Sequence, residues 1–156
     1  MAPDKPTTIV FVCRRNAGRS QMAAAYLKAI LGEDVDVRCG GTEPAQDVDV
    51  NVKRVMAEDG VSLERAKPRA LDLSSIAAAD RVIAMGCAIG DVRRLPRVDE
   101  DWGIEDVEGL DLDAARAIRD GIKRRVLGLV GNIRRGDLGA PTGMLYAEEL
   151  VPWRDP

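Results

Sequence analysis

The sequence passes from Thr8-Ile-Val-Phe-Val-Cys13, an uninterrupted apolar run, into the polar stretch Arg14-Arg-Asn-Ala-Gly-Arg19-Ser20. Continuous hydrophobicity and β-branched residues are typical of a strand that is buried on both faces of a parallel sheet. From Ser20 onward, apolar residues recur at helical spacing until Gly32 supplies a stop signal. The stretch therefore predicts a strand, a tight loop and a helix.

The rest of the chain continues this alternation. Further strands are predicted at 35–39, at 81–85 and, shorter, near 102–104, and further helices at 51–59, at 73–79 and along the apolar stripe from Ile118 to Ile133 that Gly136 closes. The start of the helix at 51–59 is open, because Val48, Val50 and Val52 also fit the alternation of a strand. On the last helix we expect four basic residues to face water: Arg116, Arg119, Lys123 and Arg124. The alternation predicts a three-layer α/β fold with a parallel sheet in the middle.

The length of 156 residues fits one domain. We place this domain at residues 1–136, up to the end of the last predicted helix. Residues 137–156 are rich in proline and glycine and are predicted to form a C-terminal tail, either mobile or docked on a partner.

Composition excludes several classes of function. The formal net charge of −3 gives no basic field for nucleic acid. No apolar stretch approaches the roughly 20 residues of a membrane helix, and the N-terminus lacks the apolar centre of a signal peptide, so we expect a cytoplasmic protein that binds neither nucleic acid nor membranes. The absence of histidine excludes Ser-His-Asp and Cys-His sites. The three cysteines have no C-x-x-C spacing, and no metal or cofactor is expected.

The loop after the first strand has the features of an oxyanion cradle. A loop between a strand and a helix can point successive backbone N–H groups inward, and the helix N-terminus adds partial positive charge. We expect Gly18 to permit a positive φ where the loop curls, and Arg19 to offer a planar fork of donors to two oxygens of a tetrahedral anion. The expected oxyanion-binding residues are Arg14, Arg15, Asn16, Ala17, Gly18, Arg19 and Ser20.

The same features favour ionisation of Cys13. Helix N-termini and nearby cations stabilise a thiolate, but the helix terminus alone contributes only about 0.3–1 kcal/mol. Arg19, the loop amides and a hydrogen bond from the Ser20 hydroxyl must therefore share the effect. Cys87 follows a second predicted strand, and the carboxyl ends of parallel strands meet at one edge of a sheet. Both thiols are thus expected to border one crevice.

Five segments, in this order along the chain, match the motifs of a known family: Val12-Cys-Arg-Arg-Asn-Ala-Gly-Arg-Ser-Gln-Met-Ala23, Gly40-Gly-Thr-Glu-Pro-Ala45, Met85-Gly-Cys87, Asp101-Trp102 and Ala117-Ile-Arg-Asp120. Together they resemble the low-molecular-weight protein tyrosine phosphatase superfamily, and within it most of all the thiol-dependent arsenate reductases. The similarity covers roughly residues 8–133. It implies a four-stranded parallel sheet flanked by helices, with Cys13 as nucleophile, Arg19 as anion clamp, Asn16 shaping the loop and Asp106 as general acid.

Two features favour the reductase branch of this family. The phosphatase branch usually carries Asp-Pro followed by tyrosines. Residues 102–109 of this chain, Trp-Gly-Ile-Glu-Asp-Val-Glu-Gly, have no tyrosine nearby and are similar to the reductases' tryptophan and acid-glycine pattern, although Val107 stands where proline is usual. Cys87 stands where the reductases have their second redox thiol. The resemblance therefore implies that Cys13 attacks arsenate, that Cys87 then closes a disulfide as arsenite leaves, and that Asp106 protonates the departing oxygen. The alternative is a protein tyrosine phosphatase or phosphomonoesterase that works through a phosphocysteine.

Besides Val107, the chain departs from the family in two places. The third cysteine of the reductases is missing, which leaves open a Cys13–Cys87 disulfide reduced by thioredoxin, a mixed disulfide with a low-molecular-weight thiol, or Cys39 as an unusual third member. Cys39 can equally be a small buried apolar residue. Arg14 and Arg15 either raise anion affinity or select acidic substrates, or they point to solvent and pair with the acidic loop. A non-enzymatic oxyanion sensor that docks a partner through its tail is the third alternative.

Overall fold

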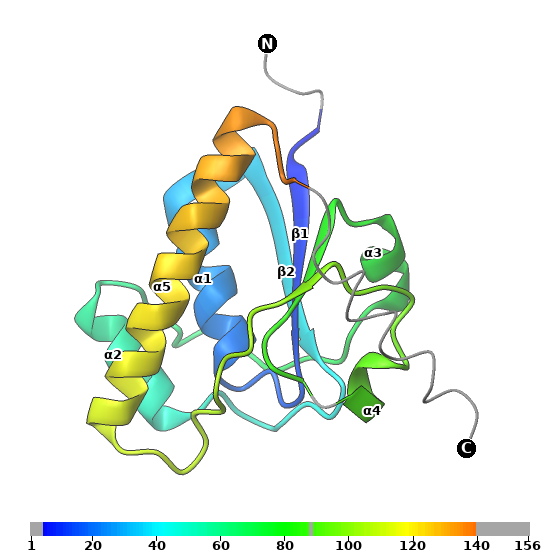
Figure 1. The fold of residues 1–156 in the computed structure, drawn as a ribbon. Helices are drawn as coiled ribbons and strands as arrows, with labels where there is room; N and C mark the ends of the chain where they lie inside the picture. The colour runs from blue at the N-terminus through cyan, green and yellow to red at the C-terminus, as the bar shows by residue number, and fades with distance from the viewer. Residues whose placement is uncertain (1–4, 88, 140–156) are drawn as a thin grey trace.

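The computed structural model describes residues 5–87 and 89–139. Within them, the strands and helices are β1 (Thr7–Cys13), α1 (Arg19–Leu31), a 3-10 turn (Gly32–Asp34), β2 (Val35–Gly41), α2 (Val50–Glu58), α3 (Leu73–Ala78), β3 (Arg81–Ala84), α4 (Ile89–Val92), β4 (Glu100–Asp101) and α5 (Leu112–Arg135). The strands pair in parallel in the order β2-β1-β3-β4 (Figure 1). The expected four-stranded parallel sheet flanked by helices is confirmed.

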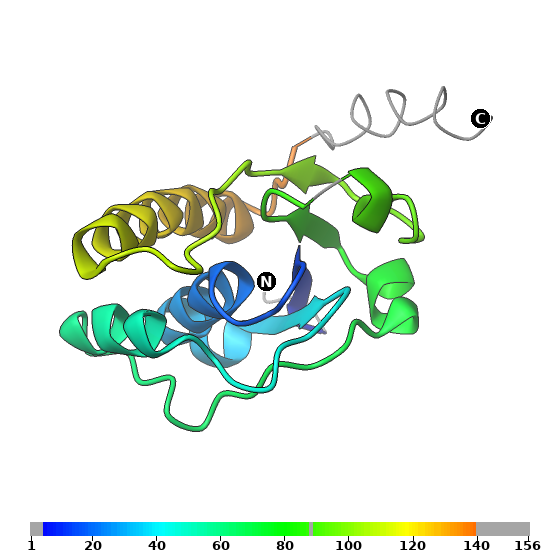
Figure 2. The same ribbon diagram turned by 90° about the horizontal axis from the view of Figure 1, so that it is seen from below.

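Strand β1 lies at the centre of this sheet. It pairs with β2 along its whole length and with β3 from Ile9 to Val12. Phe11 in its middle is entirely buried, because helices cover both faces: Figure 2 shows α1, α2 and α5 on one face and α3 and α4 on the other. The three layers leave the carboxyl ends of β1 and β3, and the loops that follow them, together at one end of the sheet.

Local signals set the boundaries of the helices. The Asp49 carboxylate accepts two backbone N–H groups of the first turn of α2, at 2.8 and 3.2 Å. This cap starts the helix at Val50, so the alternation around Val48 does not form a strand. Gly136 adopts the left-handed conformation, and its N–H donates back to the last turn of α5. Helix α5 therefore ends at the predicted stop.

Two predictions for the segment between β3 and α5 are wrong. The short edge strand lies at Glu100–Asp101 rather than near 102–104, because this register pairs it with Ile83 and Ala84. The Trp102 ring turns inward instead and packs edge-on against Phe11, with ring centroids 5.5 Å apart. Helix α4 lies in a stretch that was predicted as loop, since a single helical turn is too short to show a periodic pattern.

The prediction that Arg119 faces water is also wrong. Its side chain is only 10% exposed. The guanidinium donates to the Val55 carbonyl and to Glu58, each over 2.8 Å, and to Asp120 over 3.0 Å. Because Val55 lies in the last turn of α2, where carbonyls lack helical donors, Arg119 caps that helix from α5.

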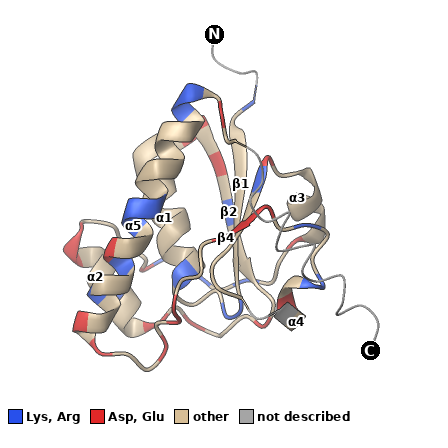
Figure 3. Ribbon diagram, viewed as in Figure 1, with Lys and Arg blue, Asp and Glu red and all other residues tan. Residues whose placement is uncertain are grey.

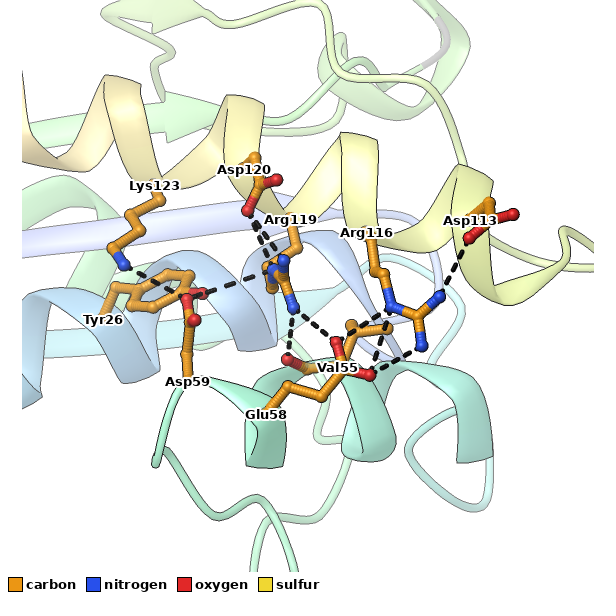
Figure 4. A network of polar contacts seen from close by, with 9 residues as sticks. All are labelled: Tyr26, Val55, Glu58, Asp59, Asp113, Arg116, Arg119, Asp120 and Lys123. Carbon is orange, nitrogen blue, oxygen red and sulfur yellow. Dashed lines mark hydrogen bonds and ion pairs between the residues drawn. The ribbon is translucent and has the colours of Figure 1, made fainter.

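The neighbouring charges extend this contact into a network that joins three helices (Figure 4). Arg116 forms a bidentate pair with Glu58, with Nε donating to Oε1 and Nη2 to Oε2. Lys123 contacts Asp59, which also accepts the Tyr26 hydroxyl of α1 over 2.6 Å. Charges of both signs occur along α2 and α5 (Figure 3). Of the four basic residues expected to face water, Arg124 is exposed, and Arg116 and Lys123 are partly covered by these contacts.

The described helices include none that combines the length and the apolar character needed to cross a bilayer. Of the predicted tail, residues 140–156 lie outside the described residues. The domain boundary after residue 136 therefore stays a prediction.

Candidate active site

The cysteine loop, residues 13–20, joins the end of β1 to the start of α1. Four of its carbonyls accept hydrogen bonds from backbone N–H groups of residues 42–49, which follow β2. The contacts are Thr42 N–H to Cys13 C=O at 3.2 Å, Glu43 N–H to Arg14 C=O at 2.7 Å, Ala45 N–H to Arg15 C=O at 2.9 Å and Asp49 N–H to Ala17 C=O at 2.9 Å. The loop is therefore held from outside along nearly its whole length.

These contacts orient the amides of the cysteine loop. In a planar trans peptide, the C=O of one residue and the N–H of the next point in opposite directions. With the carbonyls of residues 13, 14, 15 and 17 turned outward, the N–H groups of residues 14, 15, 16 and 18 turn inward. The Asn16 N–H donates to Cys13 Sγ over 3.2 Å, in agreement with this geometry. The loop thus presents a ring of donors of the kind that binds a tetrahedral anion.

A chain of side-chain hydrogen bonds reaches the sulfur of Cys13. Asn16 Oδ1 accepts the backbone N–H of Arg69 at 2.9 Å and Gln21 Nε2 at 3.1 Å. These bonds fix the amide so that Asn16 Nδ2 donates to Ser20 Oγ over 2.8 Å. Since Ser20 Oγ accepts there, its own proton is available to Cys13 Sγ, 2.8 Å away. A hydroxyl that donates in this way stabilises negative charge on the sulfur.

The prediction of a positive φ at Gly18 is wrong. Gly18 has φ −150°, and the residue in the left-handed region is Asn16, with φ 52°. Asparagine tolerates this conformation better than most residues, and its side-chain bonds hold it there. Gly18 is required for a different reason, because a Cβ at this position would overlap Val107 Cγ2. The buried Val107 thereby sets the chain that carries Asp106 directly on the cysteine loop.

The Arg19 guanidinium is buried and fixed in place. Its Nη1 donates to the carbonyls of Met85 at 2.9 Å, Gly86 at 3.1 Å and Ile104 at 3.2 Å. Its Nη2 lies 3.9 Å from Asp106 Oδ2. Three carbonyls thus anchor one corner of the guanidinium, and the other corner is directed toward the carboxylate that borders the loop. A planar donor group fixed in this way is suited to bidentate contact with an oxyanion.

A cavity of about 210 Å³ lies against the cysteine loop. Its lining includes Cys13, Arg15, Arg19 and Asp106. Cys13 is only 1% exposed, so this cavity is the approach to its sulfur. The Asp106 side chain is half exposed, and its Oδ1 accepts the Glu108 N–H over 3.1 Å. The structure therefore brings a cysteine, a guanidinium and a carboxylate to one small space.

Cys87 lies beside the cysteine loop but does not line that cavity. Its thiol donates to the Val12 carbonyl over 3.4 Å, which places it next to the residue that precedes Cys13. Burial raises the pKa of the Cys87 thiol to about 12, and the negative charge of Cys13 acts in the same direction. In this conformation Cys87 is a neutral thiol close to Cys13.

Arg14, Arg15 and Cys39, the other residues for which the sequence left alternatives open, lie in different surroundings. Arg14 points to solvent and pairs with Glu43 over 3.0 Å, whereas Arg15 borders the cavity. Cys39 lies on β2 near Asn16, and burial is the main cause that raises the pKa of its thiol. The pairing of Arg14 agrees with the solvent-facing alternative for that residue. Gln21, which donates to both the main chain and the side chain of Asn16, was missed because nothing in the sequence separates it from an ordinary helical residue.

Comparison with known proteins agrees with this geometry. The family model described as low molecular weight phosphotyrosine protein phosphatase matches residues 8–137. A putative arsenate reductase of Halobacterium salinarum is 34% identical over 88% of this chain and 100% of its own length, and a glutaredoxin arsenate reductase of Synechocystis is 30% identical over 80% and 97%.

Solved structures give the same family resemblance. A thioredoxin-dependent arsenate reductase of Corynebacterium glutamicum superposes with a TM-score of 0.73 at 32% identity, over 86% of this chain and 65% of that one. An arginine phosphatase of Geobacillus stearothermophilus superposes with a TM-score of 0.73 at 28% identity, over 84% and 95%. With its cysteine loop, its sheet order and the match over residues 8–137, the chain belongs to the low molecular weight phosphotyrosine protein phosphatase family.

Proposed function

We propose that this protein is a thiol-dependent arsenate reductase. The observation that carries the proposal is the geometry of the cysteine loop. Four of its amides turn inward, the Ser20 hydroxyl lies 2.8 Å from Cys13 Sγ, and the fixed Arg19 guanidinium borders the same cavity as Cys13. The relatives named as arsenate reductases support the choice of substrate. Arsenate is a tetrahedral oxyanion, and such a ring of donors together with a guanidinium fits it.

In the first step Cys13 attacks the arsenic atom. A sulfur–arsenic bond forms, an arsenic–oxygen bond breaks, and the departing oxygen takes a proton to leave as water. Asp106 is our candidate for the proton donor, because it borders the same cavity and this chain has no histidine. Arg19 and the loop amides hold the remaining oxygens during this step.

In the second step Cys87 attacks the sulfur of the Cys13 adduct. Burial is the main cause of the raised pKa of the Cys87 thiol, so this step requires Cys87 to become exposed to solvent, which takes up its proton. Cys87 then loses its proton and a disulfide forms with Cys13. The electron pair of the sulfur–arsenic bond remains on arsenic, which leaves as arsenite. Thioredoxin or a low-molecular-weight thiol reduces the disulfide.

A phosphatase reaction is the second candidate, and the lining of the cavity favours a particular kind of substrate. Four carboxylates border it, those of Asp47, Asp49, Asp106 and Glu108, and its described lining contains no aromatic side chain. An acidic lining of this kind attracts a substrate whose phosphate is attached to a cationic group, and it offers no aromatic contact to phosphotyrosine. The similarity to an arginine phosphatase is in line with this candidate.

The variant Cys87→Ser separates the two reactions. A reductase loses thiol-dependent arsenate reduction in this variant and keeps hydrolysis of p-nitrophenyl phosphate. Cys39→Ser is the matched control and should retain both activities if Cys39 takes no part. Intact mass after arsenate treatment in limiting reductant, followed by peptide mapping, should show a Cys13–Cys87 disulfide. Hydrolysis of phosphate esters without arsenate reduction in the unmodified protein would reject the reductase in favour of the second candidate.

A further inference from the structure

A second and larger cavity, of about 470 Å³, lies next to the edge strand β2. Four basic residues border it, Arg38 on β2 and Arg65, Lys67 and Arg69 on the segment between α2 and α3. We call it the basic cleft. Cys13 is not among its lining residues. No step of the proposed reaction uses it.

The basic cleft keeps an excess of positive charge after its internal contacts are counted. Asp36 pairs with Arg38, and Lys67 pairs with Asp47 outside the cleft. Asp72 caps α3 and stays ionised, because hydrogen bonds from Ser74 and Ser75 lower its pKa to about 2. The guanidinium groups of Arg65 and Arg69 have no hydrogen bond or ion pair to the residues that the structure describes.

The main chain behind these arginines is fixed. Gly41 N–H donates to the Arg69 carbonyl at 3.0 Å, and Leu71 N–H donates to the Gly41 carbonyl at 3.3 Å, so the segment is bonded to the end of β2. The Lys67 carbonyl accepts Gln21 Nε2 at 3.2 Å. The main chain that carries Lys67 and Arg69 is therefore held at three points, and their exposed side chains extend from a fixed backbone.

We propose that the basic cleft is a second anion site, which binds a small polyanion with two or more phosphate groups. Guanidinium groups form bidentate contacts with phosphate oxygens. The cleft is more than twice as large as the cavity at Cys13, about 470 against 210 Å³, so it has room for more than one such group. The inference does not rest on the proposed reaction.

The basic cleft is also connected to the cysteine loop. Arg69 borders the cleft, and its backbone N–H donates to Asn16 Oδ1 over 2.9 Å. A polyanion that binds Arg69 therefore contacts the residue that orients Asn16, and through Asn16 the hydroxyl of Ser20. Occupancy of the cleft is expected to cover Cys39, which also lines it.

The test is an amide NMR titration of the full chain with inorganic pyrophosphate. We expect the amides of residues 65–72, other than Pro68, to shift and saturate with their own dissociation constant, separate from that of residues 14–20. The double variant Arg65→Gln/Arg69→Gln should raise that constant at least tenfold and leave the response of residues 14–20 in place. The control Arg54→Gln/Arg134→Gln removes the same charge from exposed positions on α2 and α5 and should change it less than twofold.

Iodoacetamide labelling of Cys39 gives an independent measurement. Pyrophosphate should slow this labelling in the unmodified protein and not in the double variant, because Cys39 lines the cleft. Shifts confined to residues 14–20 would overturn the proposal. Equal weakening in the double variant and in the control would also overturn it, since the effect would then be general electrostatics. Orthophosphate that saturates residues 65–72 as tightly as pyrophosphate would refute the preference for a polyanion.

Discussion

Replacing Arg119 by methionine removes the donors that join α5 to the end of α2 while keeping most of the buried aliphatic stem. The Val55 carbonyl then loses its partner, and an unsatisfied buried acceptor costs about 1–3 kcal/mol. The contacts to Glu58 and Asp120 add less, because those carboxylates are 39% and 48% exposed and are rehydrated by solvent. We expect Arg119→Met to lower the free energy of unfolding by about 2–3 kcal/mol.

Urea denaturation and thermal melting measure this loss. For a domain of this size the expected drop in Tm is about 5–10 °C. The matched control is Arg116→Met, one turn away on α5, which removes a bidentate pair with Glu58 on an exposed surface and should cost well under half as much. If the Arg119 variant stays within about 0.5 kcal/mol of the unmodified protein, or the Arg116 variant loses as much, Arg119 is not the cap that the geometry indicates.

Three further predictions concern the cysteine loop and its neighbour. Gly18→Ala should lower turnover strongly, because the new Cβ overlaps Val107 and displaces it. Adding Val107→Ala should restore part of the lost turnover. A double variant no more active than Gly18→Ala would contradict this packing. Ser20→Ala should slow alkylation of Cys13 by iodoacetamide at pH 7 about tenfold, because a hydrogen bond to a charged group stabilises it by about 1.5–3 kcal/mol; an unchanged alkylation rate would count against Ser20 as donor. The free energy of unfolding should fall as the pH rises above about 9, because burial raises the pKa of Cys87 to about 12 and the thiol in the unfolded chain loses its proton at lower pH. The measurement is the urea denaturation midpoint as a function of pH, and Cys87→Ala should reduce its decrease at alkaline pH. If the decrease is the same in Cys87→Ala, this thiol is not its source.

Much of the fold could be predicted from the sequence because its signals are local. The apolar run that forms β1 lies between two neighbouring strands and beneath helices on both faces, so it needs hydrophobic residues throughout. Gly136 ends α5 through its left-handed conformation, a property of the residue itself. The edge strand β4 could not be placed because its two residues pair through main-chain bonds and carry no pattern of their own.

The sequence by itself determined the order of elements and the position of the cysteine loop, since both depend on residues close together in the chain. Tertiary structure alone decided which groups surround the sulfur. Ser20 donates to Cys13 because Arg69, far along the chain, fixes the amide of Asn16. Arg119 is buried instead of solvated for the same reason: a side chain's partners come from other elements, and their approach is set by packing, which no local pattern records.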